Sequence, residues 1–265
     1  MGQRVHSLRK PSATAGYPPG VQTDWDATTY DRVADPQTRW GIAVLGRLPL
    51  RGDERVLDAG CGSGRVTELL AKRLPDGSVV ALDRSATMLT EARRRLARFG
   101  DRIDYVQADL NRRLVIEPPV DAILSTATFH WIPDHDTLFR NLAAILRPGG
   151  WLVAQCGGQG NVASLERVLD AMGETWIERK FAGPLETAAR LEAAGFVDVE
   201  TWLSDEPTRF EPGQPFEAFL ETVCLRENLT HIPASRRGAF VRRVAEWLGE
   251  PVLDYVRLNI VARRS

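Results

Sequence analysis

The chain has 265 residues, of which 43% are hydrophobic and 26% are charged, as expected for a globular protein with a sizeable core. Its 34 basic and 35 acidic residues leave a formal net charge of −1, which argues against nucleic-acid or membrane-surface binding. No apolar run approaches the roughly 18 residues that a membrane span needs. We therefore expect neither a nucleic-acid partner nor a membrane span.

The N-terminal segment and the cysteines indicate the compartment. Prolines and glycines interrupt residues 1–23, and no hydrophobic segment follows their basic residues, so we predict a flexible leader rather than a secretory signal. Cys61, Cys156 and Cys224 form neither a disulfide framework nor a zinc spacing. We expect a cytoplasmic protein without a bound metal.

The first predicted strand begins at Arg55 and continues into the glycine-rich run Asp58-Ala-Gly-Cys-Gly-Ser-Gly64. A helical stretch follows, and then a second strand over 79–82 that ends at Asp83. Glycines at 60, 62 and 64 allow a tight turn and a close approach of a ligand to the main chain. A carboxylate at the tip of the second strand can accept two hydrogen bonds from a ribose diol. This unit predicts an adenosine-binding site.

Strand and helix patterns alternate along the next stretch. Ser85 is typical of an N-cap, and the helix after it places Met88, Leu89, Ala92, Leu96 and Phe99 on one face. Further strands are predicted at 103–107, 120–125 and 151–156, with a helix between the last two that is opened by Pro133 and Asp134 and stopped by 147–150. Such alternation predicts a parallel, doubly wound sheet with helices on both faces. The candidate ligand-binding residues at the carboxyl ends of its strands are Gly60 to Gly64, Asp83, Asp109 and Ser125 to His130.

The second half of the chain has more helices. Amphipathic helices are predicted at 162–176, 185–194, 216–226 and 235–248, with strands at 196–203 and 255–262. In the last helix we expect Phe240, Val241, Val244, Trp247 and Leu248 to point inward. We expect the two strands to complete the sheet while some of the helices form a cap over its carboxyl edge.

The glycine spacing separates two classes of ligand. In a dinucleotide fingerprint the third glycine would fall at position 65, but the chain has Gly64 and then Arg65. The run from Asp58 to Gly64 instead resembles the first motif of class I S-adenosylmethionine-dependent methyltransferases. Segments 82–89, 107–109, 129–135 and 146–150 resemble the trans-aconitate and malonyl-carrier-protein methyltransferase branch of that class.

This resemblance implies a fold and a division of the chain. The expected fold is α/β, a doubly wound, mainly parallel, seven-stranded Rossmann-like sheet with helices on both faces and a helical cap. Residues 24–50 would form an N-terminal helical lid, 51–156 the cofactor-binding core, and 157–265 the cap together with the last strands of the same domain.

The resemblance also implies roles for individual residues. Asp58 and the turn through Gly60, Cys61, Gly62 and Gly64 would hold the methionine end of S-adenosylmethionine. Asp83 would bind the ribose hydroxyls beside Arg84, and Ser125 belongs to the same cofactor site. Met88 would pack on adenine, while Asp109 and the Leu110 backbone would contact the adenine amino edge. At three of these positions a structural role without ligand contact stays open: core packing for Met88, a small residue that fills the turn for Cys61 and a turn cap for Asp109.

Candidates for the acceptor site are fewer. His130 could act as a general base, or it could stack under the cofactor or bond a backbone carbonyl. Tyr30 and Trp131 are candidate substrate-binding residues, and Trp40 could line the acceptor pocket or anchor its helix. We expect His135 to face solvent. An acidic acceptor could be bound by arginines of the cap, whose candidates are Arg209, Arg226, Arg236 and Arg237, although a solvated charged face would equally explain each.

The predicted function is methyl transfer from S-adenosylmethionine to a small-molecule acceptor, with a carboxylate or another oxygen nucleophile favoured and S-adenosylhomocysteine as product. Two alternatives stay open. One is a non-catalytic fold relative that only binds S-adenosylmethionine, and the other is a nicotinamide-dependent oxidoreductase, which the glycine spacing disfavours.

Overall fold

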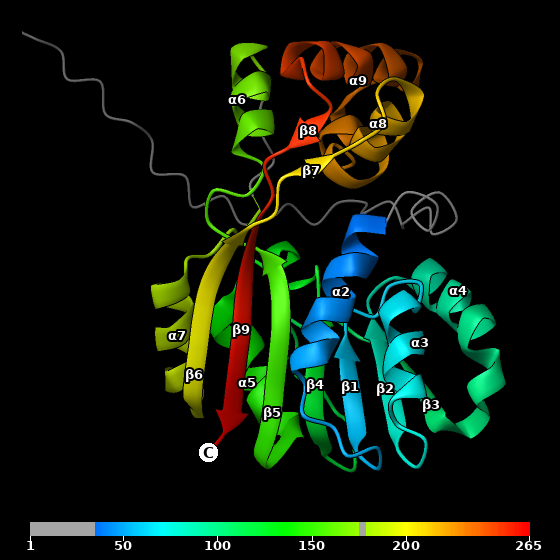
Figure 1. The fold of residues 1–265 in the computed structure, drawn as a ribbon, viewed down its shortest axis with the longest axis vertical. Helices are drawn as coiled ribbons and strands as arrows, with labels where there is room; N and C mark the ends of the chain where they lie inside the picture. Colours follow the sequence, from blue (N-terminus) through cyan, green and yellow to red (C-terminus); the bar gives the residue numbers. More distant parts are fainter. Residues whose placement is uncertain (1–34, 175–178) are drawn as a thin grey trace, which may run out of the picture.

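A computed structural model describes residues 35–174 and 179–265 and shows a seven-stranded sheet (Figure 1). Its strands are β1 (Arg55–Ala59), β2 (Ser78–Asp83), β3 (Ile103–Gln107), β4 (Val120–Thr126), β5 (Leu146–Gly157), β6 (Phe196–Asp205) and β9 (Val256–Arg264). The order is β3-β2-β1-β4-β5-β9-β6, and β9 runs antiparallel to both of its neighbours. The predicted α/β, mainly parallel, doubly wound fold is confirmed.

Three helices cover one face of the sheet: α2 (Asp35–Arg47), α3 (Arg65–Lys72) and α4 (Ala86–Leu96). Helix α4 begins where Ser85 predicts, because the Ser85 hydroxyl accepts a hydrogen bond of 3.1 Å from the Met88 amide. It ends at Leu96, and a 3₁₀ turn over Ala97–Arg102 carries Phe99, which packs partly buried against this core.

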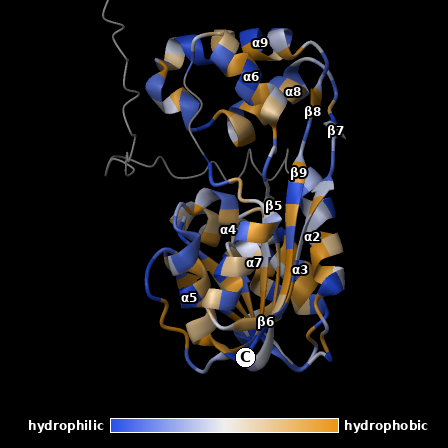
Figure 2. Cartoon of the chain, turned by 90° about the vertical axis from the view of Figure 1, so that its left-hand side faces the viewer, coloured by the Kyte–Doolittle hydropathy of each residue, from blue (hydrophilic) through white to orange (hydrophobic). Residues whose placement is uncertain are grey.

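The opposite face is covered by α5 (His135–Ile145) and α7 (Pro184–Ala193). Asp134 caps α5 by accepting a 2.9 Å hydrogen bond from the Thr137 amide. Figure 2 shows the hydrophobic residues of the strands between the two helical layers. Each layer thus buries one face of the parallel strands, as near-continuous apolar strands require.

One predicted boundary was misplaced. Residues 147–150 do follow the end of α5, but they belong to β5 rather than to a turn before it. The pairing of β5 with β4 passes from Val120–Leu146 to Ala122–Trp151, so these residues form a bulge. The strand begins earlier than predicted because Leu146 already pairs with Val120, ahead of the Pro-Gly-Gly segment.

A cap lies beyond the carboxyl ends of the parallel strands, at the top of Figure 1. Its elements are α6 (Ala163–Ala171), α8 (Gln214–Phe219), a π-helix (Leu220–Cys224), a 3₁₀ helix (Asn228–His231), α9 (Ala234–Leu248) and the strand pair β7 (Thr208–Arg209) and β8 (Val252–Leu253). The predicted helix at 216–226 therefore changes to a π-helix half-way, and the short β7–β8 pair was not predicted.

The cap has its own apolar core, which includes Leu165, Phe216, Phe219, Val241 and Val244. Trp247 was predicted to point into it, but its side chain is 53% exposed, because Val241 and Val244 fill the inner stripe of α9. Trp176, the predicted end of α6, lies outside the described residues, as do the predicted leader and residues 24–34 of the predicted lid.

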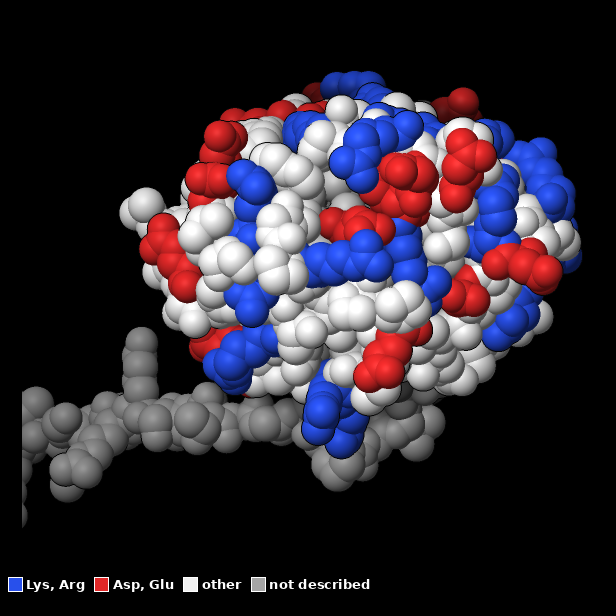
Figure 3. All heavy atoms as spheres, turned by 90° about the horizontal axis from the view of Figure 1, so that it is seen from below, with Lys and Arg blue, Asp and Glu red and all other residues white. Residues whose placement is uncertain are grey.

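Basic and acidic side chains are interspersed on the surface at the end of the sheet away from the cap, and neither charge dominates that surface (Figure 3). Within residues 35–174 and 179–265, no helix is both long and apolar enough to cross a membrane.

Candidate active site

The glycine loop is tied to the neighbouring strand through its backbone. The amides of Gly60 and Cys61 both donate to the Leu82 carbonyl, at 2.8 and 2.9 Å. Gly60 has φ of 86° and Gly62 has φ of 54°, conformations that residues with a Cβ rarely adopt. A Cβ on Gly60 would stand 2.2 Å from the Thr128 hydroxyl, whereas one on Gly62 would meet no atom within 4 Å. Gly62 therefore presents bare main chain to the space beside it.

Asp83 lies at the tip of β2 and is shared between the loop and α4. One carboxylate oxygen accepts from the Gly62 amide at 2.9 Å and the other from the Ser85 amide at 2.9 Å. Burial raises the pKa of Asp83, and these two backbone hydrogen bonds oppose the rise. The Arg84 amide also lowers the pKa of Asp83 by hydrogen bonding, and since an ionised carboxylate has about four acceptor positions, one remains for a ligand.

Four of the predicted cofactor residues lie behind the cleft rather than in its lining. Asp58 is 1% exposed, accepts a 2.7 Å hydrogen bond from the Thr67 hydroxyl, and has its pKa raised by burial to about 7. The Ser125 hydroxyl donates to the Ala59 carbonyl at 2.6 Å. Gly64 packs against α4, and Cys61 is buried within the turn. These residues support the loop from below.

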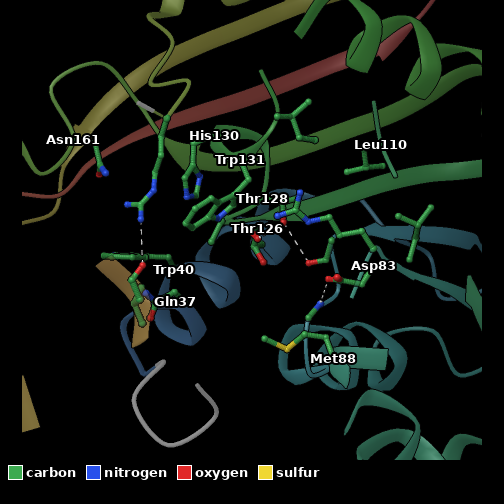
Figure 4. Close-up of a pocket in the computed structure, with 18 of the residues that line it drawn as sticks. Gln37, Trp40, Asp83, Met88, Leu110, Thr126, Thr128, His130, Trp131 and Asn161 are labelled. Carbon is green, nitrogen blue, oxygen red and sulfur yellow. Dashed lines mark hydrogen bonds between the residues drawn. The ribbon is translucent and has the colours of Figure 1, made fainter. Parts of the chain in front are cut away.

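A cleft of about 1120 Å³, including the part open to solvent, lies between the sheet edge and the cap. The predicted residues Asp83, Arg84, Met88, Asp109 and Leu110 line one end of it. Figure 4 shows Asp83, Met88 and Leu110 on one side of the cleft and His130, Trp40 and Asn161 on the other. Asp109 also accepts from the Asn111 amide at 2.9 Å, so its turn-capping role is real as well.

His130 and Trp131 line the second end, in the 3₁₀ helix Phe129–Trp131 after β4. The Gly157 amide donates to His130 Nδ1 at 3.2 Å, so the neutral ring carries its proton on Nε2. Burial lowers the pKa of His130 well below its usual value, and the charges of Arg257 and Arg179 lower it further. The ring lies between Trp131 and Phe181, with centroids 5.1 and 5.9 Å away.

Two arginines in this end were not predicted. Arg257 in β9 is 2% exposed, and its guanidinium lies 4.5 Å from the ring centroid of Trp40. Arg179 lies 4.2 Å from the ring centroid of Trp131, and its Nη2 donates to the Cys224 carbonyl at 2.6 Å. A charged residue inside the apolar run of β9 was the sequence signal for Arg257.

The cap arginines that were predicted do not line the cleft. Arg209 pairs with Glu250 at 2.8 Å on the surface, and Arg237 donates to the Ile232 carbonyl at 3.0 Å. Arg226 and Arg236 are likewise outside the lining.

The aromatic candidates and His135 have mixed outcomes. Trp40 both lines the cleft and anchors its helix, through an edge-on contact with Tyr255 at 4.9 Å. Tyr30 lies outside the described residues. His135 was expected in solvent, which is wrong: it is 2% exposed, with Nε2 3.0 Å from the Phe129 carbonyl. His135 begins α5, and its ring gives the buried Phe129 carbonyl a hydrogen-bond partner.

Comparison with known proteins identifies the family. A family model for methyltransferase domains matches residues 56–150. The trans-aconitate 2-methyltransferase of Azoarcus sp. (strain BH72) is 43% identical over 257 residues, covering 91% of this chain and 99% of the relative. That of Methylobacterium nodulans is 38% identical over 262 residues, with the same coverage of 91% and 99%. This chain belongs to the trans-aconitate branch of the class I S-adenosylmethionine-dependent methyltransferases.

The fold of this methyltransferase has relatives among solved structures. Phosphoethanolamine N-methyltransferase 2 of Haemonchus contortus, in complex with S-adenosyl-L-methionine, superposes with a TM-score of 0.60 at 20% identity. The superposition covers 90% of this chain and 57% of that chain.

The family makes this methyltransferase an enzyme whose cofactor is S-adenosylmethionine and whose acceptor is a small molecule. The predicted function is confirmed, and the nicotinamide and non-catalytic alternatives fall. The loop end of the cleft fits the cofactor, because Gly62 leaves room where a Cβ would stand and Asp83 keeps an acceptor position for a ligand.

Proposed function

We propose that this enzyme methylates a carboxylate oxygen of a small polycarboxylic acid, with trans-aconitate as the first candidate acceptor. One observation carries the proposal: the acceptor end of the cleft has Arg179, Arg257 and the Nε2–H of His130, while the carboxylates among the described lining residues, Asp83 and Asp109, both lie at the loop end. The names of the relatives at 38–43% identity agree with such an acceptor.

S-adenosylmethionine supplies an activated methyl carbon, and the acceptor oxygen bonds to it as the carbon–sulfur bond breaks. A carboxylate is already ionised near pH 7 and has no proton to lose. The chain therefore has to orient the acceptor and exclude water rather than remove a proton. Val162, Val223 and Tyr255 from the cap side of the cleft contribute to that exclusion.

The role of His130 follows from its hydrogen bond. Its Nδ1 already accepts from the Gly157 amide, and the nearby arginines oppose any added proton. A general base would need a free ring nitrogen, and this ring offers only a donor into the cleft. We propose that Nε2–H of His130 holds a carboxylate oxygen of the acceptor, in place of the base that the sequence suggested.

The cofactor assignments remain part of the proposal. Asp83 would bind the ribose hydroxyls beside Arg84, and Met88 with Asp109 and Leu110 would surround the adenine. The main chain of the glycine loop would hold the methionine end, with Asp58, Cys61, Gly64 and Ser125 supporting it from behind. Trp131 would flank the acceptor.

The compartment is also a proposal. Cys61, Cys156 and Cys224 are all free and buried, which fits a reducing environment such as the cytoplasm.

The test is an acceptor screen with the purified enzyme. S-adenosylhomocysteine release is measured with trans-aconitate, cis-aconitate, citrate, a phenol panel and an amine panel. We expect release with trans-aconitate and a product heavier by one methylene group that mild base hydrolyses back to the acid. Turnover of phenols or amines with none for carboxylic acids would overturn the proposal.

A further inference from the structure

We propose that Asn161 binds the acceptor through its side-chain NH2 group, which donates to an oxygen of the group that is methylated. The fold fixes the direction in which this side chain donates, so Asn161 would determine which acceptor atoms fit beside it. The inference rests on the proposed function in taking the methylated atom to be an oxygen.

The carboxamide of Asn161 can take only one orientation. Asn161 is buried, and its Oδ1 accepts a hydrogen bond of 3.0 Å from the amide of Val256, the first residue of β9. A backbone amide can only donate, so the oxygen of the carboxamide must face Val256 and its NH2 group must face the other way. An asparagine that could otherwise donate or accept is thereby fixed as a donor.

The NH2 group of Asn161 faces the open space of the cleft. Asn161 belongs to the lining, and its Nδ2 donates to no atom within residues 35–174 and 179–265. Nor is Nδ2 one of the fully buried polar atoms that lack a partner in those residues, so solvent reaches it from the cleft. Its hydrogens are therefore available to a ligand.

Nδ2 of Asn161 lies beside the residue that orients His130. A Cβ on Gly157 would stand 3.1 Å from Asn161 Nδ2, and the Gly157 amide donates to His130 Nδ1. Figure 4 shows Asn161 and His130 on the same side of the cleft. Two neutral donors thus lie around the end of β5. An acceptor that presented an N–H to Asn161 would meet a second donor, whereas an oxygen without a proton would accept from it.

The turn that carries Asn161 is held in a strained conformation. The next residue, Val162, has φ of 52°, which a β-branched residue rarely adopts, and it also lines the cleft. The Val162 amide donates to the Asp254 carbonyl at 3.0 Å, and the Ser164 amide donates to the Asp254 carboxylate at 2.9 Å. Backbone strain that the surrounding structure maintains is typical of ligand-binding positions. This strain is independent of the bond to Val256 and points to the same position.

The experiment separates the two ends of the carboxamide. Asn161→Asp keeps an oxygen for the Val256 amide and replaces the NH2 group, so an asparagine with a purely structural role would tolerate this change. Gln37→Glu is the matched control, because it makes the same change from amide to acid in the lining of the same cleft. The values of kcat/KM for trans-aconitate are measured for wild type and both variants.

We expect kcat/KM to fall by about 100-fold or more in Asn161→Asp and by less than about 10-fold in Gln37→Glu. Both variants add a negative charge to the cleft, but only Asn161→Asp also removes a donor from the acceptor. Equal losses in the two variants would mean that the added charge is the whole effect and would overturn the proposal, as would an unchanged kcat/KM in Asn161→Asp.

A measurement on wild type keeps the test decisive if Asn161→Asp fails to fold. The side-chain NH2 signals of Asn161 are followed by NMR in ¹⁵N-labelled enzyme saturated with S-adenosylhomocysteine, with trans-aconitate and catechol as the probes. We expect an Nδ2 proton to move downfield as a probe binds, because a hydrogen bond to an anionic oxygen forms. Signals that stay in place while a methylated acceptor is bound would overturn the proposal.

The same titration separates this inference from the proposed function. If wild type methylates phenols rather than carboxylic acids and the Asn161 signal moves with catechol, the proposed function fails while Asn161 keeps its role. If wild type methylates trans-aconitate and the signal does not move with it, the inference about Asn161 fails alone.

Discussion

The two ends of the cleft are built in different ways. The loop end is made mostly of main chain and Asp83 within the span from β1 to α4, joined by Asp109 and Leu110 just after β3. The acceptor end takes side chains from residues 40, 130, 179 and 257, which are brought together by the order of the strands. A contiguous motif therefore predicts the proposed cofactor end of the cleft, while the proposed acceptor end is assembled from residues that no single segment contains.

The largest effect we expect comes from breaking the loop end. Gly60→Ala would place a Cβ 2.2 Å from the Thr128 hydroxyl at a φ of 86°, so the glycine loop and the segment that carries Thr128 would have to move apart. We expect a loss of about 3 kcal/mol in the free energy of unfolding, measured by urea denaturation, and loss of S-adenosylhomocysteine binding.

Gly62→Ala is the matched control. Its Cβ would meet no protein atom, so it should cost only about 1 kcal/mol of stability, yet still weaken cofactor binding by standing in the cleft. Equal destabilisation by the two variants would contradict our account of the loop.

A smaller effect is expected at Asp83, because the substitution changes a side chain and leaves the main-chain conformation as it is. Asp83→Asn should weaken S-adenosylhomocysteine binding by about 1–3 kcal/mol in calorimetry, because charged hydrogen bonds to the ribose are lost. Asp104→Asn, on the exposed surface of neighbouring β3, is the control and should bind as wild type does. Unchanged affinity in Asp83→Asn would remove the ribose assignment.

The acceptor end should respond to pH. The folded-state pKa of His130 is below the ordinary 6.5, so between these two values the unfolded chain binds more protons than the folded one. Stability that depends on the neutral ring is thus fully present above pH 6.5 and is lost as pH falls below it. Relative to His130→Asn, wild type should lose up to about 1.4 kcal/mol per pH unit there, measured by urea denaturation.

His135, Arg179 and Arg257 are the charged or titratable groups that influence this ring, and all three are kept in the variant. If His130 were instead a base with a pKa near neutrality, the two stability curves would run parallel through this range. Turnover of trans-aconitate would then show an inflection that disappears with His130→Asn.

The smallest effect is expected on the cap surface. Trp247→Ser removes a side chain that is 53% exposed and should change the free energy of unfolding by less than about 0.5 kcal/mol. Val244→Ala, one helical turn earlier and fully buried, should cost about 1–3 kcal/mol. Thermal melts of both variants compare the outer and inner faces of α9. A larger loss of stability in Trp247→Ser than in Val244→Ala would contradict the assignment of Val244 to the buried face.

The fold could largely be predicted because its signals are local. β3 was predicted with its observed bounds, and Ser85 and Asp134 cap the helices they were expected to cap. The β7–β8 pair is too short to leave a periodic pattern. Trp247 and His135 were misplaced because periodicity and residue type do not show which neighbour fills a position.

The candidate site divides in the same way. Asp83 and the loop glycines could be placed together because they belong to one strand–turn–helix–strand unit, in which the Gly62 amide donates to Asp83. The apolar run around Arg257 was a signal, but it does not show that β9 lies inside the sheet, between β5 and β6, rather than at its edge. The position of the Arg179 side chain depends on its hydrogen bond to the π-helix. No sequence pattern indicated that π-helix, so Arg179 could not be predicted.

The route of the chain through β6 and β9 bears on how such enzymes diversify. Residues 206–255 leave the sheet after Asp205 and return at Val256, and these two residues are paired across the ladder. An excursion whose two ends are neighbours can be exchanged between homologues by recombination without disturbing the sheet. Arg257, just past the return point, would stay behind with the glycine loop, while Cys224 would leave with the exchanged piece. Such an exchange would replace Val223, Cys224 and Tyr255 in the lining of the cleft, while Gly60, Gly62 and Asp83 would stay as they are.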